Sequence, residues 1–134
     1  MKIPEWLPTY GDTSYRGKCP VESAEQITFF NVLAVKHPRL RRIAIHPRNE
    51  GKRTPQQAQR HKAEGLTKGA SDIIIPAGVS FVCELKRLDH TLCKWEDGQL
   101  EYLEVAQEQG AFVCVALGWE AAFEALGEWM KDNG

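Results

Sequence analysis

Residues 81–86 read FVCELK, and this hexapeptide decides how the chain is interpreted. The pattern predicts a strand, in which strict alternation places Val82, Glu84 and Lys86 on one face. A carboxylate and an amine therefore project side by side from a strand that apolar runs flank. A charged side chain inside a sheet needs a partner or a metal ion. The alternative is a structural ion pair between Glu84 and Lys86 at a strand end.

The segment before this strand supplies a second carboxylate. Residues 72–76 and 79–86 predict two antiparallel strands joined by a tight two-residue hairpin. Counting outward from that turn places Asp72 opposite Cys83, so a bulge or a different turn is needed to bring Asp72 and Glu84 onto one face. Two adjacent carboxylates repel each other unless a cation lies between them, and oxygen ligands suit Mg²⁺ or Mn²⁺. Asp72 and Glu84 are therefore a candidate metal site.

Hydrophobic periodicity and turn residues predict the remaining elements. Residues 1–20, rich in Pro and Gly, predict an irregular arm, and residues 21–134 a single domain. One helix joins the strand that ends at Lys86 to the next strand, so these two strands should be parallel, with a right-handed crossover. The order predicts an α/β fold in which helices flank a mixed central sheet. We expect helices at 21–36, between Thr54 and Gly65, at 95–109 and at 119–130, and strands at 40–46, 72–76, 79–86 and 111–116.

Length and composition fit one globular domain. The chain has 134 residues, of which 43% are hydrophobic and 26% charged. No run approaches the ~18 apolar residues of a membrane-spanning helix, and the N-terminus lacks the features of a signal peptide. Four cysteines lie far apart without a C-x-x-C pair, so neither a zinc site nor a disulfide framework is indicated. We therefore expect a cytoplasmic protein with reduced thiols.

The net charge of -1 conceals an uneven distribution. Residues 36–68 contain ten Lys or Arg side chains against two glutamates, whereas nine acids and a single lysine fall between residues 96 and 132. Clustered Lys and Arg are the electrostatic footprint of nucleic-acid binding. A solvated basic surface without a ligand is the alternative.

Two polar side chains lie on one face of the first predicted helix. Glu22 and Gln26 are four residues apart, a spacing that makes them neighbours on a helix surface. The simpler interpretation is a first-turn glutamate that the helix dipole favours, beside a solvent-facing glutamine. The pair alone does not distinguish that arrangement from a functional one.

Taken together, these residues resemble the VRR-NUC family, the virus-type replication-repair nucleases of the PD-(D/E)xK superfamily. The resemblance runs from about Val21 to Met130. It implies a restriction-endonuclease-like αβββαβ core, and standalone members of this length resemble phage or prophage proteins that are expected to form homodimers. Two departures are Ser71, where proline is common, and a longer segment before Gln99. The matching motifs are Glu22 with Gln26, KAEGLTKGASD at 62–72, ELK at 84–86, Gln99, and RNEGKR at 48–53, which is similar to the family's polar N-G-G-K-R-like loop.

The resemblance implies metal-dependent hydrolysis of DNA phosphodiester bonds, with Mg²⁺ or Mn²⁺ as the cofactor. Asp72, Glu84 and the carbonyl of Leu85 are expected to hold the ion. Glu22 is expected to bind a second ion or to position the attacking water, which Lys86 would orient. Gln26 and Gln99 complete the expected catalytic set as hydrogen-bonding groups.

The resemblance also gives the basic segment at residues 36–68 a role in binding DNA, because nucleic-acid affinity comes mostly from neutralising phosphates. A homodimer would present two sites, which suits a two-fold substrate such as a four-way (Holliday) junction in a bacterial or phage-infected cell. The alternatives are a flap or nicking nuclease of the same fold, and a non-cleaving DNA-binding module whose carboxylates are structural. The expected nucleic-acid-binding residues are Arg48, Lys52, Arg53, Arg60, Lys62 and Lys68.

Overall fold

The computed structural model describes residues 1–47 and 53–133, and its centre is a four-stranded sheet in the order β1-β4-β3-β2. β3 (Phe81–Lys86) pairs in parallel with β4 (Phe112–Leu117) and antiparallel with β2 (Ile73–Ile75). β1 (Thr9–Tyr10) adds to β4 in parallel. The predicted α/β class with a mixed sheet is therefore confirmed, and β3 lies inside the sheet with every residue buried.

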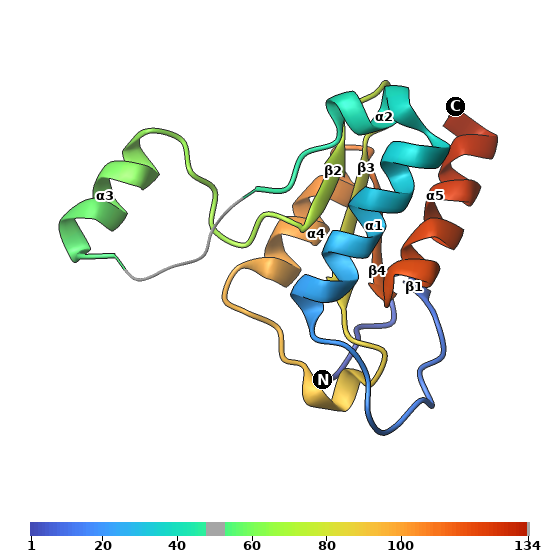
Figure 1. Cartoon of the computed structure of the whole chain (residues 1–134). Coiled ribbons are helices and arrows are strands. Elements are labelled where there is room, and N and C mark those ends of the chain that lie inside the picture. Colours follow the sequence, from blue (N-terminus) through green and yellow to red (C-terminus); the bar gives the residue numbers. More distant parts are fainter. Residues whose placement is uncertain (48–52, 134) are drawn as a thin grey trace.

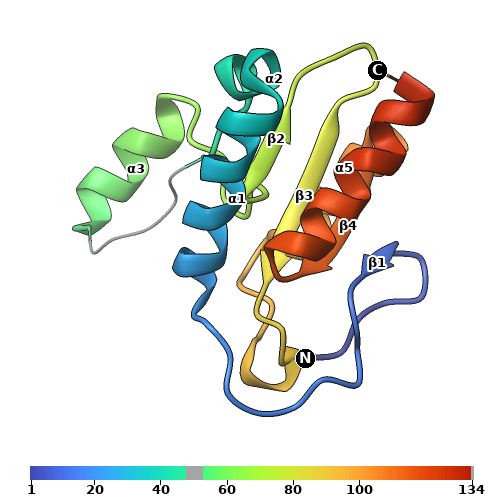
Figure 2. The same cartoon turned by 45° about the vertical axis from the view of Figure 1, so that its right-hand side comes forward.

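Helices cover both faces of this sheet, and Figure 2 shows α1 and α5 together on one of them. α1 (Glu22–Lys36) and α5 (Trp119–Asn133) pack against the side chains of Phe81, Cys83 and Leu85. α4 (Gln99–Glu108) packs on the opposite face, with Val82. The alternation predicted for residues 81–86 is thus confirmed, because the two faces contribute to two separate hydrophobic clusters.

The polar helix predicted after Thr54 is also present, as α3 (Pro55–Ala63). The Thr54 side chain accepts a hydrogen bond from the Gln57 amide, and the Gln57 side chain accepts one from the Thr54 amide. This reciprocal capping box satisfies two amides at the helix start. α3 buries none of its residues, and Figure 1 shows it standing apart from the sheet.

The strand predicted at residues 40–46 is wrong. The segment instead forms a short helix, α2 (Pro38–Ile43), because proline has a φ value suited to the first helical position and the four residues after it are not β-branched. Only Ile45 keeps sheet character, through a two-way backbone bridge to Ile74 on the outer edge of β2.

Three further boundaries differ from the sequence prediction. The helix expected from residue 95 begins at Gln99, after Gly98 with its φ of +89°. The arm at residues 1–20 contains β1, which its Pro and Gly content does not predict. The tight hairpin at residues 77–78 is absent, because β2 ends at Ile75 and β3 begins at Phe81, so five residues connect them.

That longer connection changes the register by one residue. Ile73 pairs with Cys83 and Ile75 with Phe81. Continuing the ladder by one residue places Asp72 opposite Glu84, on the same side of the sheet. No bulge is needed, and both carboxylates point to the face that α4 covers.

No helix in the part of the chain that the structure describes is both long enough and apolar enough to cross a bilayer.

Candidate active site

Three carboxylates from three different elements converge at one end of the sheet. Glu84 comes from β3, Asp72 directly precedes β2, and Glu22 is the first residue of α1. One carboxylate oxygen from each lies within 4.8 Å of the others. The sequence expectation that Asp72 and Glu84 share a face is therefore met.

Glu84 is the most constrained of the three. Its side chain has no exposed surface, and its Oε1 accepts a hydrogen bond of 3.0 Å from Gln99 Nε2. Its Oε2 has no hydrogen-bond partner within residues 1–47 and 53–133. Burial raises the pKa of Glu84 well above its usual range, and the nearby Asp72 carboxylate raises it further. A buried, half-unsatisfied carboxylate destabilises a fold unless it is protonated or meets a cation.

The backbone of β3 fixes the side chain of Asp72. Asp72 Oδ2 accepts a hydrogen bond of 2.9 Å from the Leu85 amide, and the carbonyl oxygen of Asp72 lies 2.9 Å from His46 Nδ1. Glu22 is more open and lies 4.0 Å from the Lys86 ammonium. Desolvation raises the pKa of Glu22, although the charge of Lys86 opposes that shift.

Lys86 is buried at the centre of this group, with an exposed fraction of 1%. Its Nζ donates to the Lys94 carbonyl at 2.9 Å and to Gln99 Oε1 at 3.1 Å. The ammonium also lies 5.3 Å from the centre of the Trp95 ring, within the range of a cation–π contact. These contacts fix the amine beside the carboxylates.

Gln99 connects the charged groups. Its amide nitrogen donates to Glu84, while its amide oxygen accepts from Lys86 and from the Glu96 backbone amide at 2.8 Å. One side chain at the first position of α4 therefore orients both a carboxylate and the amine.

Glu22, Asp72, Lys86 and Gln99 line a cleft of about 580 Å³, and Glu84 is buried behind them. Two lysines stand at the cleft in ion pairs with acidic neighbours, Lys68 with Asp97 and Lys94 with Glu96. Exposed pairs of this kind contribute little to stability, so either lysine is available to exchange its partner for a phosphate.

The geometry fits a divalent cation. The donors are all carboxylate oxygens, the type that Mg²⁺ and Mn²⁺ prefer. Of the two oxygens of buried Glu84, one lacks any hydrogen bond, which leaves it free to act as a ligand. An ion here would also offset the repulsion between Glu84 and Asp72 that raises the pKa of Glu84.

Backbone packing holds the elements of the site in place, and sequence reasoning missed it. A Cβ atom on Gly69, which has a φ of +78°, would lie 2.3 Å from the carbonyl carbon of Gly98. This close approach ties the segment before Asp72 to the start of α4. Arg87 donates to the carbonyls of Cys19 and Pro20 at 2.9 and 3.0 Å, which ties β3 to the chain just before α1.

Other predicted site residues lie outside this cluster. Gln26 lines a separate hollow on α1. Leu85 contributes its amide to Asp72, and the role expected for its carbonyl stays a prediction.

The predicted nucleic-acid-binding residues lie near α3 and at the cleft. Arg53 contacts His61, Arg60 pairs with Glu64, and Lys62 is exposed on the same helix. Lys68 lies at the cleft. Arg48 and Lys52, with most of the predicted polar loop, lie outside the residues that the structure describes.

Comparisons with known proteins support the fold. A solved structure described as a "VRR_NUC domain protein" has a TM-score of 0.68 and 20% sequence identity, and the match covers 85% of this chain and 91% of that one. The resemblance inferred from the sequence is thus confirmed at the level of the fold. No family model matches the sequence, and no curated protein matches it.

Proposed function

We propose that this protein belongs to the VRR-NUC family and is a divalent-metal-dependent endonuclease that hydrolyses phosphodiester bonds in DNA. The observation that carries the proposal is the meeting of Glu22, Asp72 and Glu84 beside a buried lysine at the end of the sheet. A fold shared with a VRR_NUC domain protein supports it.

Each side chain has a role that its contacts support. Asp72, Glu84 and Glu22 would hold Mg²⁺ or Mn²⁺, together with the carbonyl of Leu85. When bound, the ion polarises the scissile phosphate and lowers the pKa of a water molecule. Lys86, held beside Glu22, donates a hydrogen bond toward the attacking water or the charge that develops on the phosphate.

Gln99 orients the reacting groups rather than reacting itself. Because its amide contacts both Glu84 and Lys86, it fixes the carboxylate and the ammonium relative to each other. Gln26 lies one turn beyond Glu22 and serves as a hydrogen-bonding group toward the substrate.

The basic segment supplies affinity for DNA. α3 exposes its polar surface on all sides, and Arg53, Arg60 and Lys62 neutralise phosphates at a distance from the cleft. Lys68 does the same at the cleft itself. Arg48 and Lys52 belong to the same proposed surface.

The proposal includes the assembly and the substrate that the family resemblance implies. A homodimer acting in the cytoplasm of a bacterial or phage-infected cell would carry two sites, which suits the paired nicks that resolve a four-way junction. Flap cutting and nicking are the alternatives within the same chemistry. A non-cleaving DNA-binding module is disfavoured, because DNA binding alone gives no reason to bury the unpaired oxygen of Glu84.

Cleavage of labelled DNAs tests the proposal. Duplex, single-stranded, flapped and four-way DNAs are incubated with the protein in Mg²⁺, Mn²⁺ or EDTA. We expect cleavage with either ion, none in EDTA, and none with Glu84→Gln, which keeps the size of the side chain. Glu108→Gln, on the exposed surface of α4, is the matched control and should cleave normally. Salt-sensitive binding without cleavage in either metal would overturn the nuclease proposal in favour of the binding module.

A further inference from the structure

A second hollow lies along α1, beside the candidate active site. Its volume is about 450 Å³, and it lies between α1 and the segment that forms α2 and the bridge to β2. Among the residues that the structure describes, no carboxylate lines it, and the lining residues are Gln26, Ile27, Phe30, Asn31, Arg41, Ala44 and His46.

The walls of this hollow combine a stacking surface with hydrogen-bonding groups. The guanidinium of Arg41 lies over the Phe30 ring, 4.8 Å from its centre. A hydrogen bond of 3.4 Å from Arg41 to the Ala44 carbonyl holds that arrangement. Guanidinium planes and aromatic rings are the surfaces on which unpaired bases stack. Gln26 and Asn31 add amides that both donate and accept.

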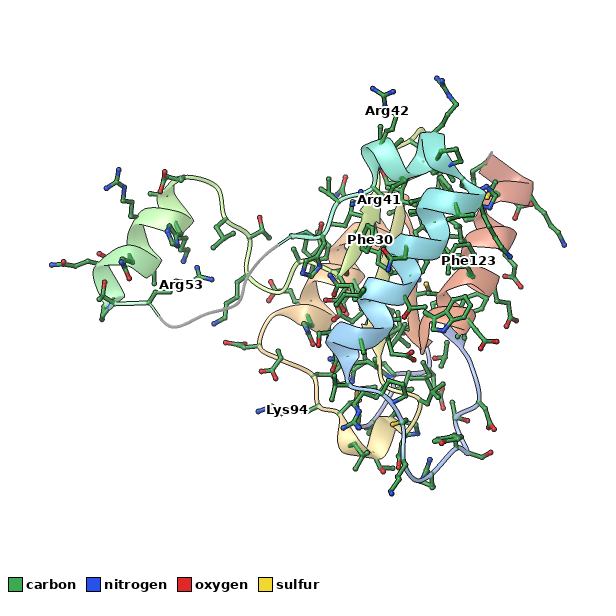
Figure 3. The ribbon with its side chains drawn as sticks, in the orientation of Figure 1. Phe30, Arg41, Arg42, Arg53, Lys94 and Phe123 are labelled. Carbon is green, nitrogen blue, oxygen red and sulfur yellow. The ribbon has the colours of Figure 1, made fainter. Side chains whose placement is uncertain are left out.

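The charge around the hollow favours a polyanion over a protein partner. Residues 36–47 contain no acidic side chain, and their charged residues are all basic. Arg41 and Arg42 are exposed on α2, and Figure 3 shows Arg42 directed away from the body of the molecule. The full basic set is Lys36, Arg39, Arg41 and Arg42.

The hollow is connected to the candidate active site in two ways. His46 lines the hollow and also contacts the carbonyl of Asp72. Along α1, Phe30 is eight residues from Glu22, which corresponds to roughly 12 Å of helix. The hollow therefore lies close enough to the carboxylate cluster for one strand of DNA to reach both.

We propose that this hollow binds an unpaired DNA strand close to the cleavage point. One base stacks on the Arg41–Phe30 pair, and Arg39 and Arg42 neutralise the phosphates beside it. The inference rests on the proposed nuclease function and deepens it. Within the proposed nuclease chemistry it favours a flapped DNA, which has a single-stranded segment next to the cleavage point, over a four-way junction, whose arms are fully paired.

Binding measurements in EDTA test this without cleavage. Fluorescence anisotropy compares a blunt duplex with the same duplex carrying a six-nucleotide extension of either polarity. For the unmodified protein we expect one extension to tighten binding about tenfold, which is about 1.4 kcal/mol and within the range for one stacked base. An extension of abasic sugars should lose most of that gain, because it keeps the phosphates but offers no base.

Variants place the effect in the hollow. Phe30→Leu combined with Arg41→Gln should bring the ratio of extended to blunt affinities close to one. Lys131→Gln removes one exposed positive charge from α5 and should keep the ratio near ten. If the double variant does not fold, as judged by its circular dichroism, the exposed change Arg42→Gln serves instead and should lower the ratio at least twofold.

Three outcomes overturn the inference. A ratio near one for the unmodified protein removes the unpaired strand as the ligand. If the Phe30 and Arg41 variant still binds the extended DNA about ten times more tightly than the blunt duplex, the unpaired strand binds at another surface. Variants that change only the sedimentation of the protein, and not the ratio, assign the hollow to contact between copies of the chain. A tenfold ratio from a protein that cleaves no DNA would instead keep this inference and reject the nuclease function.

Discussion

Replacing Glu84 with glutamine should stabilise the metal-free protein at neutral pH and remove its response to divalent ions. Glu84 is fully buried, one of its oxygens has no hydrogen bond, and Asp72 repels its charge. Glutamine has the same size and carries no charge. It accepts from Gln99 through its oxygen, as Glu84 does, and its amide donates toward Asp72.

The expected magnitude follows from that burial. An unsatisfied buried polar group costs about 1–3 kcal/mol, and more when it is charged, so the variant should gain at least about 1 kcal/mol without metal. For a chain of this length that raises the melting temperature by roughly 3–6 °C. Metal at a hundred times its dissociation constant should stabilise the unmodified protein by about 2.7 kcal/mol, and the variant by much less.

The pH dependence gives a second signature. Because folding raises the pKa of Glu84, the folded state holds its proton over a range in which the unfolded state has lost it. The contribution of Glu84 to stability is therefore complete below the unfolded value of about 4.3 and is lost as pH rises from there through the folded pKa. The variant should lack that part of the decline.

Thermal unfolding of both proteins from pH 4.5 to pH 8, with EDTA and with Mn²⁺, measures these effects. Glu108→Gln is the control for removing a carboxylate from the surface. A Glu84→Gln protein that melts well below the unmodified one in EDTA, or that Mn²⁺ stabilises equally, would refute the reasoning.

Two other substitutions and one titration test separate parts of the site. Gly69→Ala places a Cβ atom against the backbone of Gly98 at a positive φ, so chemical denaturation should show a loss of about 1–3 kcal/mol, whereas Gly78→Ala, in open space, should show almost none. Lys86→Met should slow cleavage about a hundredfold in single-turnover assays while Mn²⁺ still binds, and an unchanged rate would exclude Lys86 from the chemistry. Because the pKa of Glu84 is raised, calorimetric titration should find Mn²⁺ bound more tightly at pH 8 than at pH 6, with release of protons. Equal affinities would mean that Glu84 is not a ligand.

The sequence by itself determined the central strand and most of the helices, although it predicted a strand where α2 forms. The alternation in FVCELK predicts which side chains enter each face, and the buried clusters on the two sides of β3 follow it. The Thr54 capping box and the parallel pairing of β3 with β4 are equally local consequences, of a side chain that satisfies helix amides and of a connection that contains one helix.

Only the tertiary structure decided the register and the partners of the charged groups. A turn of two residues and a connection of five leave almost the same sequence pattern, yet the second places Asp72 opposite Glu84. The hydrogen bonds from Arg87 to the carbonyls of Pro20 and Cys19 likewise connect parts of the chain that are separated by 67 and 68 positions in the sequence. The close approach of Gly69 to Gly98 and the stacking of Arg41 on Phe30 also depend on packing. Such contacts have no signature in local sequence, because they exist only once separate elements have docked on the sheet.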